Sequence, residues 1–220
     1  MDNMVPDLSN CIVELGEALK VNKKLGELSM RNNKIKAGVY GTFFLTLCGN
    51  KSLKKLNVSK TDLNDKVVQS LVEFMQEGTT RINDLDLSRN LISDTGLKML
   101  ANGFHDNKSL VRLNLEMNLL KGEGFMHLAD YLVCNKSLTW LNLSGNRINN
   151  EGLVHLSSFL ERNETLTHLD ISKNSFSDAG FDVFAQHMAR SAGLTHLDIS
   201  RNRDINEVSL ITLAIALSKN

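Results

Sequence analysis

Apolar residues recur along the chain in a short motif that repeats at a nearly constant interval. In "SLTWLNLSGNRI", the leucines and the isoleucine lie three, two and five positions apart, with mostly polar residues between them. The motif returns every 28 residues, with a single step of 29. Its first apolar residues are Leu25, Leu53, Ile82, Leu110, Leu138, Leu166 and Leu194. A fixed period of this length is the sequence signature of a solenoid.

Each unit has two halves with different periodicities. In the fifth unit, Leu141 and Leu143 alternate with polar residues as in a short strand, and Leu153, Leu156 and Leu160 follow at helical spacing. One unit cannot bury its apolar side alone, so stacking is required. The pattern therefore predicts one parallel sheet covered by one layer of helices, with right-handed crossovers.

One polar position in each unit follows the strand and is nearly always asparagine. An asparagine amide offers donors and an acceptor to the backbone where the chain turns away. We predict a structural asparagine ladder of Asn33, Asn90, Asn118, Asn146, Asn174 and Asn202. In the second unit Thr61 takes this position, and the step that follows is the one of 29, so we expect a local irregularity there.

Two further sets of residues recur with the same period. Glycines six positions after the asparagine predict either an unusual backbone angle or close packing: Gly96, Gly124, Gly152 and Gly180. Asparagines three positions before the strand predict a left-handed cap at the end of the preceding helix: Asn50, Asn107, Asn135 and Asn163.

The motif L-x-x-L-x-L-x-x-N-x-I with a full helix resembles the ribonuclease-inhibitor-like class of leucine-rich repeats, over roughly residues 11–220. The resemblance implies an α/β fold, a right-handed leucine-rich repeat solenoid or horseshoe with a parallel concave sheet and an outer layer of helices. It also implies one domain over 1–220. Residues 1–24 form the helical half of an N-terminal repeat or cap, and 25–220 form the seven repeats.

Strand parity sorts the outward residues into three columns on the concave face. The first column is Glu27, Lys55, Asp84, Arg112, Trp140, His168 and His196. The second column is Ser29, Asn57, Asp86, Asn114, Asn142, Asp170 and Asp198. The third column is Arg31, Ser59, Ser88, Glu116, Ser144, Ser172 and Ser200. The last two columns have the small polar residues usual in these repeats, whereas every first-column position carries a long or ring-bearing side chain.

The first column is the best candidate for a partner-binding surface, because exposed Trp and Arg side chains are enriched in binding hot spots. The alternative is that Trp140 only shields the sheet. The candidate partner-binding residues are Asp84, Arg112, Trp140, His168, His196 and Glu116. Together with Asp86, Asp170 and Asp198, the acidic members of this set leave a basic protein ligand open.

His168 and His196, with Asp170 and Asp198 two residues along, also resemble a zinc-ligand pair. However, "LTHLDIS" is duplicated as a whole, so repeat duplication accounts for the coincidence. We therefore expect no metal and no cofactor.

Charge and cysteine content narrow the class of partner. Lys+Arg and Asp+Glu are balanced at 25 each, which argues against nucleic acid or a membrane surface as a partner. Three cysteines without paired spacing indicate reduced thiols, and their places in or beside the helical halves suggest small core or helix-end residues. No signal peptide, membrane span or linker after Pro6 is evident, so we expect a cytoplasmic monomer without a domain boundary.

No nucleophile elbow, phosphate-binding loop or H-E-x-x-H motif is present, so we expect no enzymatic activity. The favoured function is a non-catalytic scaffold that binds a protein on its concave face. A narrower version is a bacterial effector that acts on a host protein in the host cytoplasm. The alternative is a GTPase-activating protein resembling the Ran-directed members, for which Arg31 and Arg81 are candidates by location only, and no acidic tail is present.

Overall fold

The computed structural model describes residues 9–76 and 80–220, in which helices and strands alternate. The helices are α1 (Ser9–Val21), α2 (Ala37–Thr46), α3 (Asp65–Gln76), α4 (Asp94–Gly103), α5 (Gly124–Cys134), α6 (Asn150–Ser157), α7 (Asp178–Met188) and α8 (Glu207–Leu217). The strands are β1 (Glu27–Ser29), β2 (Lys55–Asn57), β3 (Asp84–Asp86), β4 (Arg112–Asn114), β5 (Trp140–Asn142), β6 (His168–Asp170) and β7 (His196–Asp198). Pro6, which entered the expectation about domain boundaries, lies outside the described residues.

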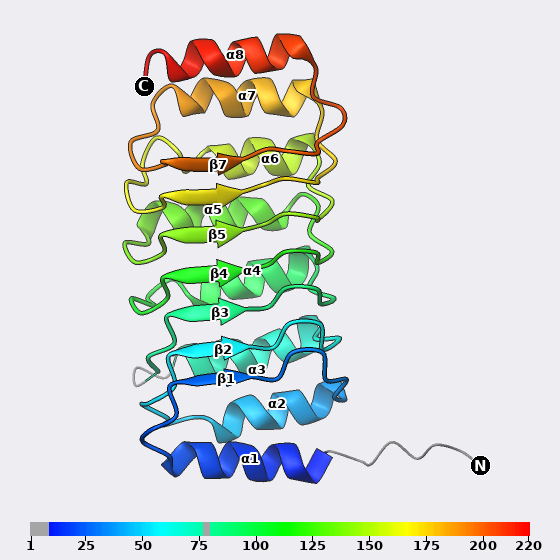
Figure 1. Ribbon diagram of the computed structural model, residues 1–220, viewed down its shortest axis with the longest axis vertical. Helices are drawn as coiled ribbons and strands as arrows, with labels where there is room; N and C mark the ends of the chain where they lie inside the picture. Colours follow the sequence, from blue (N-terminus) through cyan, green and yellow to red (C-terminus); the bar gives the residue numbers. More distant parts are fainter. Residues whose placement is uncertain (1–8, 77–79) are drawn as a thin grey trace, which may run out of the picture.

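All seven strands form one parallel sheet in sequence order, which confirms the predicted α/β solenoid. Neighbouring strands pair in the register that the repeat predicts, for example Leu113 with Leu141 and Leu141 with Leu169. Figure 1 shows the helices stacked as a second layer behind the sheet, spread over a longer path than the strands. Strands lie about 4.8 Å apart and helices are about 10 Å wide, so the sheet is on the inside of the curve.

The core lies between the two layers and is built from the repeated apolar positions. Leu141, Leu143 and Ile148 of the fifth repeat are fully buried, as are Leu153 and Leu156 of α6. Burial of this kind contributes about 1.5–3 kcal/mol for each such side chain. The inward parity predicted for the strand leucines is therefore confirmed in the central repeats.

The end repeats bury their apolar positions less completely than the motif predicts. Leu25 is 40% exposed and Leu194 is only half-buried, because a neighbouring repeat covers each of them on one side only. Helix α8 likewise exposes Leu210, Ile211 and Ile215. Membership of the repeated motif thus predicts burial only where a repeat packs on both sides.

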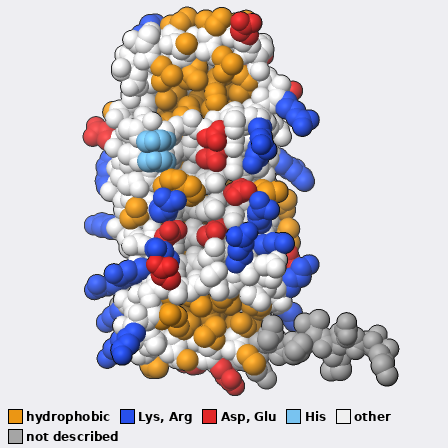
Figure 2. All heavy atoms as spheres, viewed as in Figure 1, with side chains coloured by type: hydrophobic (Ala, Val, Ile, Leu, Met, Phe, Trp, Pro, Cys, Tyr) orange, Lys and Arg blue, Asp and Glu red, His pale blue; other side chains and the backbone are white. Residues whose placement is uncertain are grey.

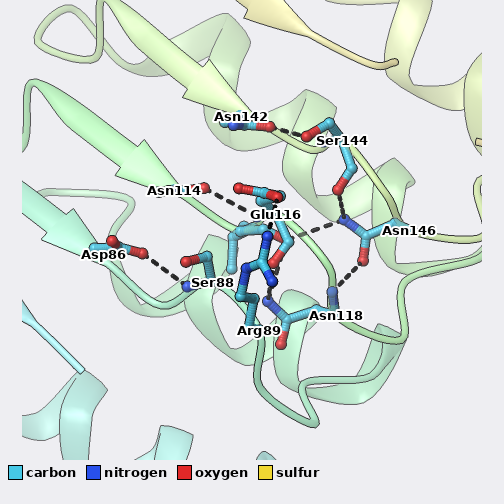
Figure 3. A network of polar contacts seen from close by, with 10 residues as sticks. Asp86, Ser88, Arg89, Asn114, Glu116, Asn118, Asn142, Ser144 and Asn146 are labelled. Atoms are coloured by element: carbon cyan, nitrogen blue, oxygen red, sulfur yellow. Dashed lines mark hydrogen bonds and ion pairs between the residues drawn. The ribbon is translucent and has the colours of Figure 1, made fainter. Parts of the chain in front are cut away.

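The asparagine ladder exists and joins consecutive repeats. Asn146, 5% exposed, donates through Nδ2 to the carbonyl oxygens of Leu143 (2.9 Å) and Leu115 (3.0 Å). Its Oδ1 accepts from the backbone N–H groups of Asn118 (3.0 Å) and Leu120 (3.3 Å). Figure 3 shows Asn118 and Asn146 linked in this way. Each rung satisfies backbone groups that the turn would otherwise leave buried and unpaired.

The ladder weakens at its N-terminal end, as the Thr61 position predicts. The Thr61 hydroxyl donates to the carbonyl of Val58 in its own repeat (2.8 Å), and its backbone N–H reaches forward to Asn90 (3.0 Å). Asn33 is exposed and donates only to carbonyls of its own repeat, at Met30 and Arg31. An isolated bridge pairs Asn64 with Leu91 in this region, and residues 77–79 of the 29-residue step lie outside the described residues.

The prediction of left-handed caps at the second asparagine set is wrong. Asn135 has an extended backbone (φ −74°, ψ 134°). Its Oδ1 accepts from the N–H groups of Ser137 (2.9 Å) and Leu138 (2.7 Å), and its Nδ2 donates to the carbonyl of Asn107 (3.2 Å). These asparagines therefore form a second ladder at the opposite ends of the strands.

In every repeat a left-handed residue lies instead one position before the first ladder: Asn32, Lys60, Arg89, Met117, Gly145, Lys173 and Arg201. Positive φ also occurs at Asp62 and at Gly49, which directly precedes Asn50. A residue with positive φ allows the chain to turn sharply as it leaves the strand, and there only Gly145 adopts it without steric cost.

The recurring glycines are explained by close packing, not by an unusual backbone angle. A Cβ on Gly152 would lie 2.5 Å from the carbonyl oxygen of Lys121, and one on Gly124 would lie 2.9 Å from that of Asp94. Neither glycine has a positive φ. Any side chain there would push adjacent helix N-termini apart.

Within the described ranges, no helix combines the length and apolar character needed to cross a bilayer.

Candidate functional site

The first column forms a continuous row across the concave face. Strand pairing places its members side by side from Glu27 and Lys55 to His168 and His196. Each strand has three residues, so only one residue on each side of the central leucine points outward. The repeat therefore fixes the position of every first-column residue on its strand. Figure 2 shows charged, hydrophobic and histidine side chains following one another along this face.

Charges in the N-terminal part of the first column pair with each other. Lys55 Nζ lies 2.6 Å from a carboxyl oxygen of Glu27, and Arg112 Nε lies 3.7 Å from one of Asp84. The Glu27 carboxylate, through a hydrogen bond and its charge, raises the pKa of the Lys55 ammonium. Such exposed pairs contribute little to stability, because solvent screens them. Their main consequence is that this part of the surface offers a partner few unpaired charges.

Trp140 is half-buried, and the guanidinium of Arg112 covers one of its ring faces. The Cζ atom of Arg112 lies 4.2 Å from the ring centroid, which is a cation–π contact. Trp140 points outward, as predicted. Its ring was expected to be exposed, but it is half-buried because Arg112 covers one face. Arg112 holds the indole in one orientation, which lowers the entropy cost of contacting a partner.

His168 and His196 stack face to face. Their ring centroids are 3.9 Å apart and the planes differ by 8°. Each Nδ1 lies close to the hydroxyl of the preceding threonine, at 2.8 Å for Thr167 and 2.9 Å for Thr195. Burial, followed by the charges of His196 and Arg112, lowers the pKa of His168, so this ring is neutral at neutral pH.

The second column is tied to its own backbone, as its small polar residues predict. The side-chain oxygen of Asn142 accepts from the N–H of Ser144 at 2.8 Å, and Asp86 accepts from Ser88 at 2.9 Å (Figure 3). Asn57 also donates to the carboxylate of Asp86 at 3.0 Å. These side chains close the turn that follows each strand.

Glu116 belongs to a different cluster from the other candidate residues. It lies in the third column, is largely buried, and pairs with Arg89 at 3.3 Å (Figure 3). Asp84, Arg112, Trp140, His168 and His196 are brought together, whereas Glu116 is held beside them by its own partner.

The remaining chemistry-bearing residues do not gather into a site. Among residues 9–76 and 80–220, no group of three or more His, Cys, Asp or Glu side chains is placed to hold a metal ion. Cys11 and Cys134 are exposed and lie in the first turn of α1 and at the last residue of α5, so of the two expected places, core or helix end, they take the helix end. Arg31 and Arg81 are exposed in the loops that follow β1 and precede β3.

A groove on the opposite, helical side offers a second concave region. It has a volume of about 790 Å³ and lies between α4, α5 and α6, with Met126, His127 and His155 among its lining residues. Its position on the outer layer separates it from the first column, so its residues serve as controls below.

Sequence reasoning found the first column but missed three of its contacts. These are the Arg112–Trp140 contact, the stacking of the two histidines, and the threonine hydroxyls that hold both rings. The last had a signal in the sequence, because "LTHLDIS" places a threonine before each histidine.

Comparison with known families identifies the repeat. A family described as Leucine Rich repeat matches residues 49–72, 82–101, 134–157 and 162–185. The chain carries leucine-rich repeats. Repeats of this kind build extended concave surfaces that bind other proteins. No curated protein matches the chain.

Two solved structures illustrate the range of similar chains. The chain is 15% identical to a structure titled "Leiomodin-1 Actin-Binding Site 2 (ABS2)", covering 98% of this chain and 90% of that one, with a TM-score of 0.45. It is also 15% identical to "Crystal Structure of a Pollen Receptor Kinase 3", covering 83% and 76%, with a TM-score of 0.48.

Proposed function

We propose that this leucine-rich repeat chain is a non-catalytic protein-interaction module whose partner binds the first column of the concave face. The proposal rests on the contiguous row of Arg112, Trp140, His168 and His196 on neighbouring strands. In this row the guanidinium of Arg112 stacks over the indole of Trp140. Partly exposed Trp and Arg side chains near the centre of a surface are the usual anchors of protein interfaces.

The contrast between columns supports the same assignment. Second-column oxygens are occupied by backbone N–H groups, so substitutions there disturb the turns. In the first column Arg112 contacts Trp140, and His168 contacts His196, across neighbouring strands, and neither contact closes a turn. A surface of this kind is free to vary for recognition without loss of the fold.

Three finer assignments are part of the proposal. The 28-residue unit with a full helix supports the ribonuclease-inhibitor-like subtype. A role as a bacterial effector acting on a host protein, and a cytoplasmic location, rest on the resemblance of the repeats. Recovery of the chain, expressed with a cleavable tag, from the cytosolic fraction of host cells bound to one host protein would support the effector role.

Trp140→Ala tests the proposal directly. Loss of the indole should weaken partner binding by about 2 kcal/mol or more, roughly 30-fold in Kd, because anchors at interface centres contribute that much. The measurement is affinity capture by the intact chain, followed by calorimetry with the captured protein.

Met126→Ala on α5 is the matched control, since Met126 is an exposed apolar side chain of the helical layer. It should leave Kd unchanged, and circular dichroism should show both variants folded. Unaltered affinity of Trp140→Ala for a partner that Met126→Ala loses would place the interface on the helices and reject the proposal.

A further inference from the structure

The hydrogen bonds around His168 fix which of its ring nitrogens carries the proton. Thr167 Oγ1 lies 3.0 Å from the carbonyl oxygen of Thr139 and 2.8 Å from His168 Nδ1. A carbonyl oxygen can only accept, so the single hydroxyl proton of Thr167 belongs to that contact. His168 Nδ1–H therefore donates to Thr167 Oγ1. The opposite assignment would leave two oxygen atoms 3.0 Å apart without a proton between them.

The same arrangement recurs one repeat later. Thr195 Oγ1 lies 3.1 Å from the carbonyl oxygen of Thr167 and 2.9 Å from His196 Nδ1. In its neutral form each ring is thus an Nδ1–H tautomer whose Nε2 atom carries a free lone pair. Because the rings are parallel and their Nδ1 atoms turn toward equivalent threonines, the two Nε2 acceptors lie on the same side of the stack. Parallel lone pairs do not converge on one metal ion, but they can serve two N–H donors.

The residues beside the stack add negative charge. Asp170 and Asp198 lie two residues further along the same strands, hence on the same face, about 7 Å away. One carboxyl oxygen of Asp170 accepts from the backbone N–H of Ser172, and one of Asp198 accepts from that of Ser200. Within the described part of the chain, neither carboxylate lies in an ion pair. Figure 2 shows histidine side chains (pale blue) on this face with acidic side chains (red) near them.

We propose that the stacked His168 and His196 receive an arginine or lysine side chain of the partner protein. A guanidinium has several N–H donors in a rigid plane, enough for both Nε2 acceptors, and its charge is attracted by Asp170 and Asp198. This inference rests on the proposed function, since it names the chemistry of the partner that the first column binds. It also explains why a surface with paired charges at one end has unpaired acceptors at the other.

Acidification should release such a partner. Protonation of either ring turns Nε2 into a donor and puts positive charge where the cation docks. The other charged groups that face the stack are Arg112 across Trp140, the two aspartates, and Lys173 and Arg201, which act on Asp198. Burial and the charges of His196 and Arg112 lower the pKa of His168, so protonation of this ring, and with it release of the partner, requires acid below the ordinary range of a histidine. An acidic partner would show the reverse dependence, with tighter binding in acid.

The test uses the intact chain and two probes, N-acetyl-Gly-Arg-Gly-amide and N-acetyl-Gly-Glu-Gly-amide, followed by NMR of the imidazole groups. Long-range ¹H–¹⁵N correlations should show both rings as Nδ1–H tautomers at about pH 7.5. The arginine probe should shift the signals of His168 and His196 saturably at this pH, with at least about tenfold weaker binding at pH 5. Nε2–H tautomers, no shift with the arginine probe, or tighter binding of the glutamate probe in acid would overturn the proposal.

Variants separate the site from general effects of charge. The double substitution His168→Gln and His196→Gln should abolish saturable binding of the arginine probe. Because this variant lacks both imidazoles, its binding is followed through the backbone amide signals of β6 and β7. His127→Gln on α5 is the matched control and should keep saturable binding. Thr167→Val with Thr195→Val should keep both rings but lose the fixed tautomer.

The outcome is independent of the search for a natural partner. If Trp140→Ala weakens a partner that the histidine double variant binds unchanged, the proposed function stands and the cation site is rejected. If no protein binds the concave face, the probe titration still decides whether the stack binds a cation.

Discussion

The first and second columns lie on the same strands, two residues apart, and yet the contacts that recur in them differ: cross-strand side-chain contacts in the first, hydrogen bonds to the strand's own backbone in the second, where Asn57 to Asp86 is a cross-strand exception. In six of the seven strands a second-column oxygen accepts the N–H two residues further along its own chain, as at Asn57, Asp86, Asn114, Asn142, Asp170 and Asp198. First-column side chains such as Arg112, Trp140 and His168 contact side chains of neighbouring strands. In a repeat protein, the direction of a polar contact therefore separates residues that close turns from residues that face a partner.

The largest loss of stability is expected from substituting the side chains that make the most hydrogen bonds to the backbone. Asn146→Ala removes an amide that serves three carbonyls and two N–H groups, leaving buried groups unpaired, so the free energy of unfolding should fall by about 1–3 kcal/mol. Asn33→Ala is the control within the same ladder, because Asn33 is exposed and bonds only within its own repeat. Urea unfolding of both variants measures the contrast. Equal losses for the two substitutions would mean that the ladder does not couple repeats.

A second-column substitution should affect stability and leave recognition unchanged. Asn142→Ala removes one hydrogen bond to the Ser144 N–H in a buried turn, a loss of about 1 kcal/mol. Ser29→Ala in the first strand is exposed and should cost less. Thermal unfolding gives the stability change, and calorimetry with the partner should give an unchanged Kd. A tenfold weaker Kd for Asn142→Ala would remove the distinction between the columns.

Within the first column, Arg112 should matter to recognition through Trp140. Arg112→Ala removes the cation over the indole, so the ring loses its fixed orientation and partner affinity should fall by about 0.5–1 kcal/mol. Lys55→Ala is the matched loss of a cation from the same column, and its pair with Glu27 is exposed. Calorimetry should show no change for that variant. If both variants weaken binding equally, net charge rather than the held indole determines affinity.

The smallest expected effect concerns Asp198 and acid. Hydrogen bonds from Ser200, first from its backbone N–H, and the charges of Lys173 and Arg201 lower the pKa of Asp198. A lowered pKa in the folded state adds stability above the unfolded value of about 3.9 and loses it as pH falls through the folded value. Asp198→Asn should therefore melt slightly below the unsubstituted chain at pH 7, and the difference in Tm should vanish near pH 2. A difference that persists in acid would assign the effect to lost hydrogen bonding.

Periodicity predicted those features that depend on position within the repeat. The sheet, its register, the three columns and the ladder follow from spacing alone, because every repeat must present the same residues to its neighbours. Leu25 was expected to be core and is not, since the motif does not say how many neighbours a repeat has.

Features that depend on side-chain conformation were not predictable in the same way. The guanidinium over Trp140 and the stacked histidines require rotamers that the sequence does not specify. The left-handed position was placed at Asn135 because helix ends often have such a residue, but there the amide satisfies the backbone with extended geometry. The turn after the strand, at Arg89 and its equivalents, takes the positive φ instead.

Oxidative footprinting of the complex with hydroxyl radicals tests the central claim most directly, because it reports which side chains a bound partner covers. Trp140, His168 and His196 on the concave face should be oxidised more slowly in the complex. Met126 and His127 on α5 should react at the same rate with and without partner. Protection of the α5 residues with unchanged oxidation of Trp140 would contradict the assignment of the first column as the binding surface.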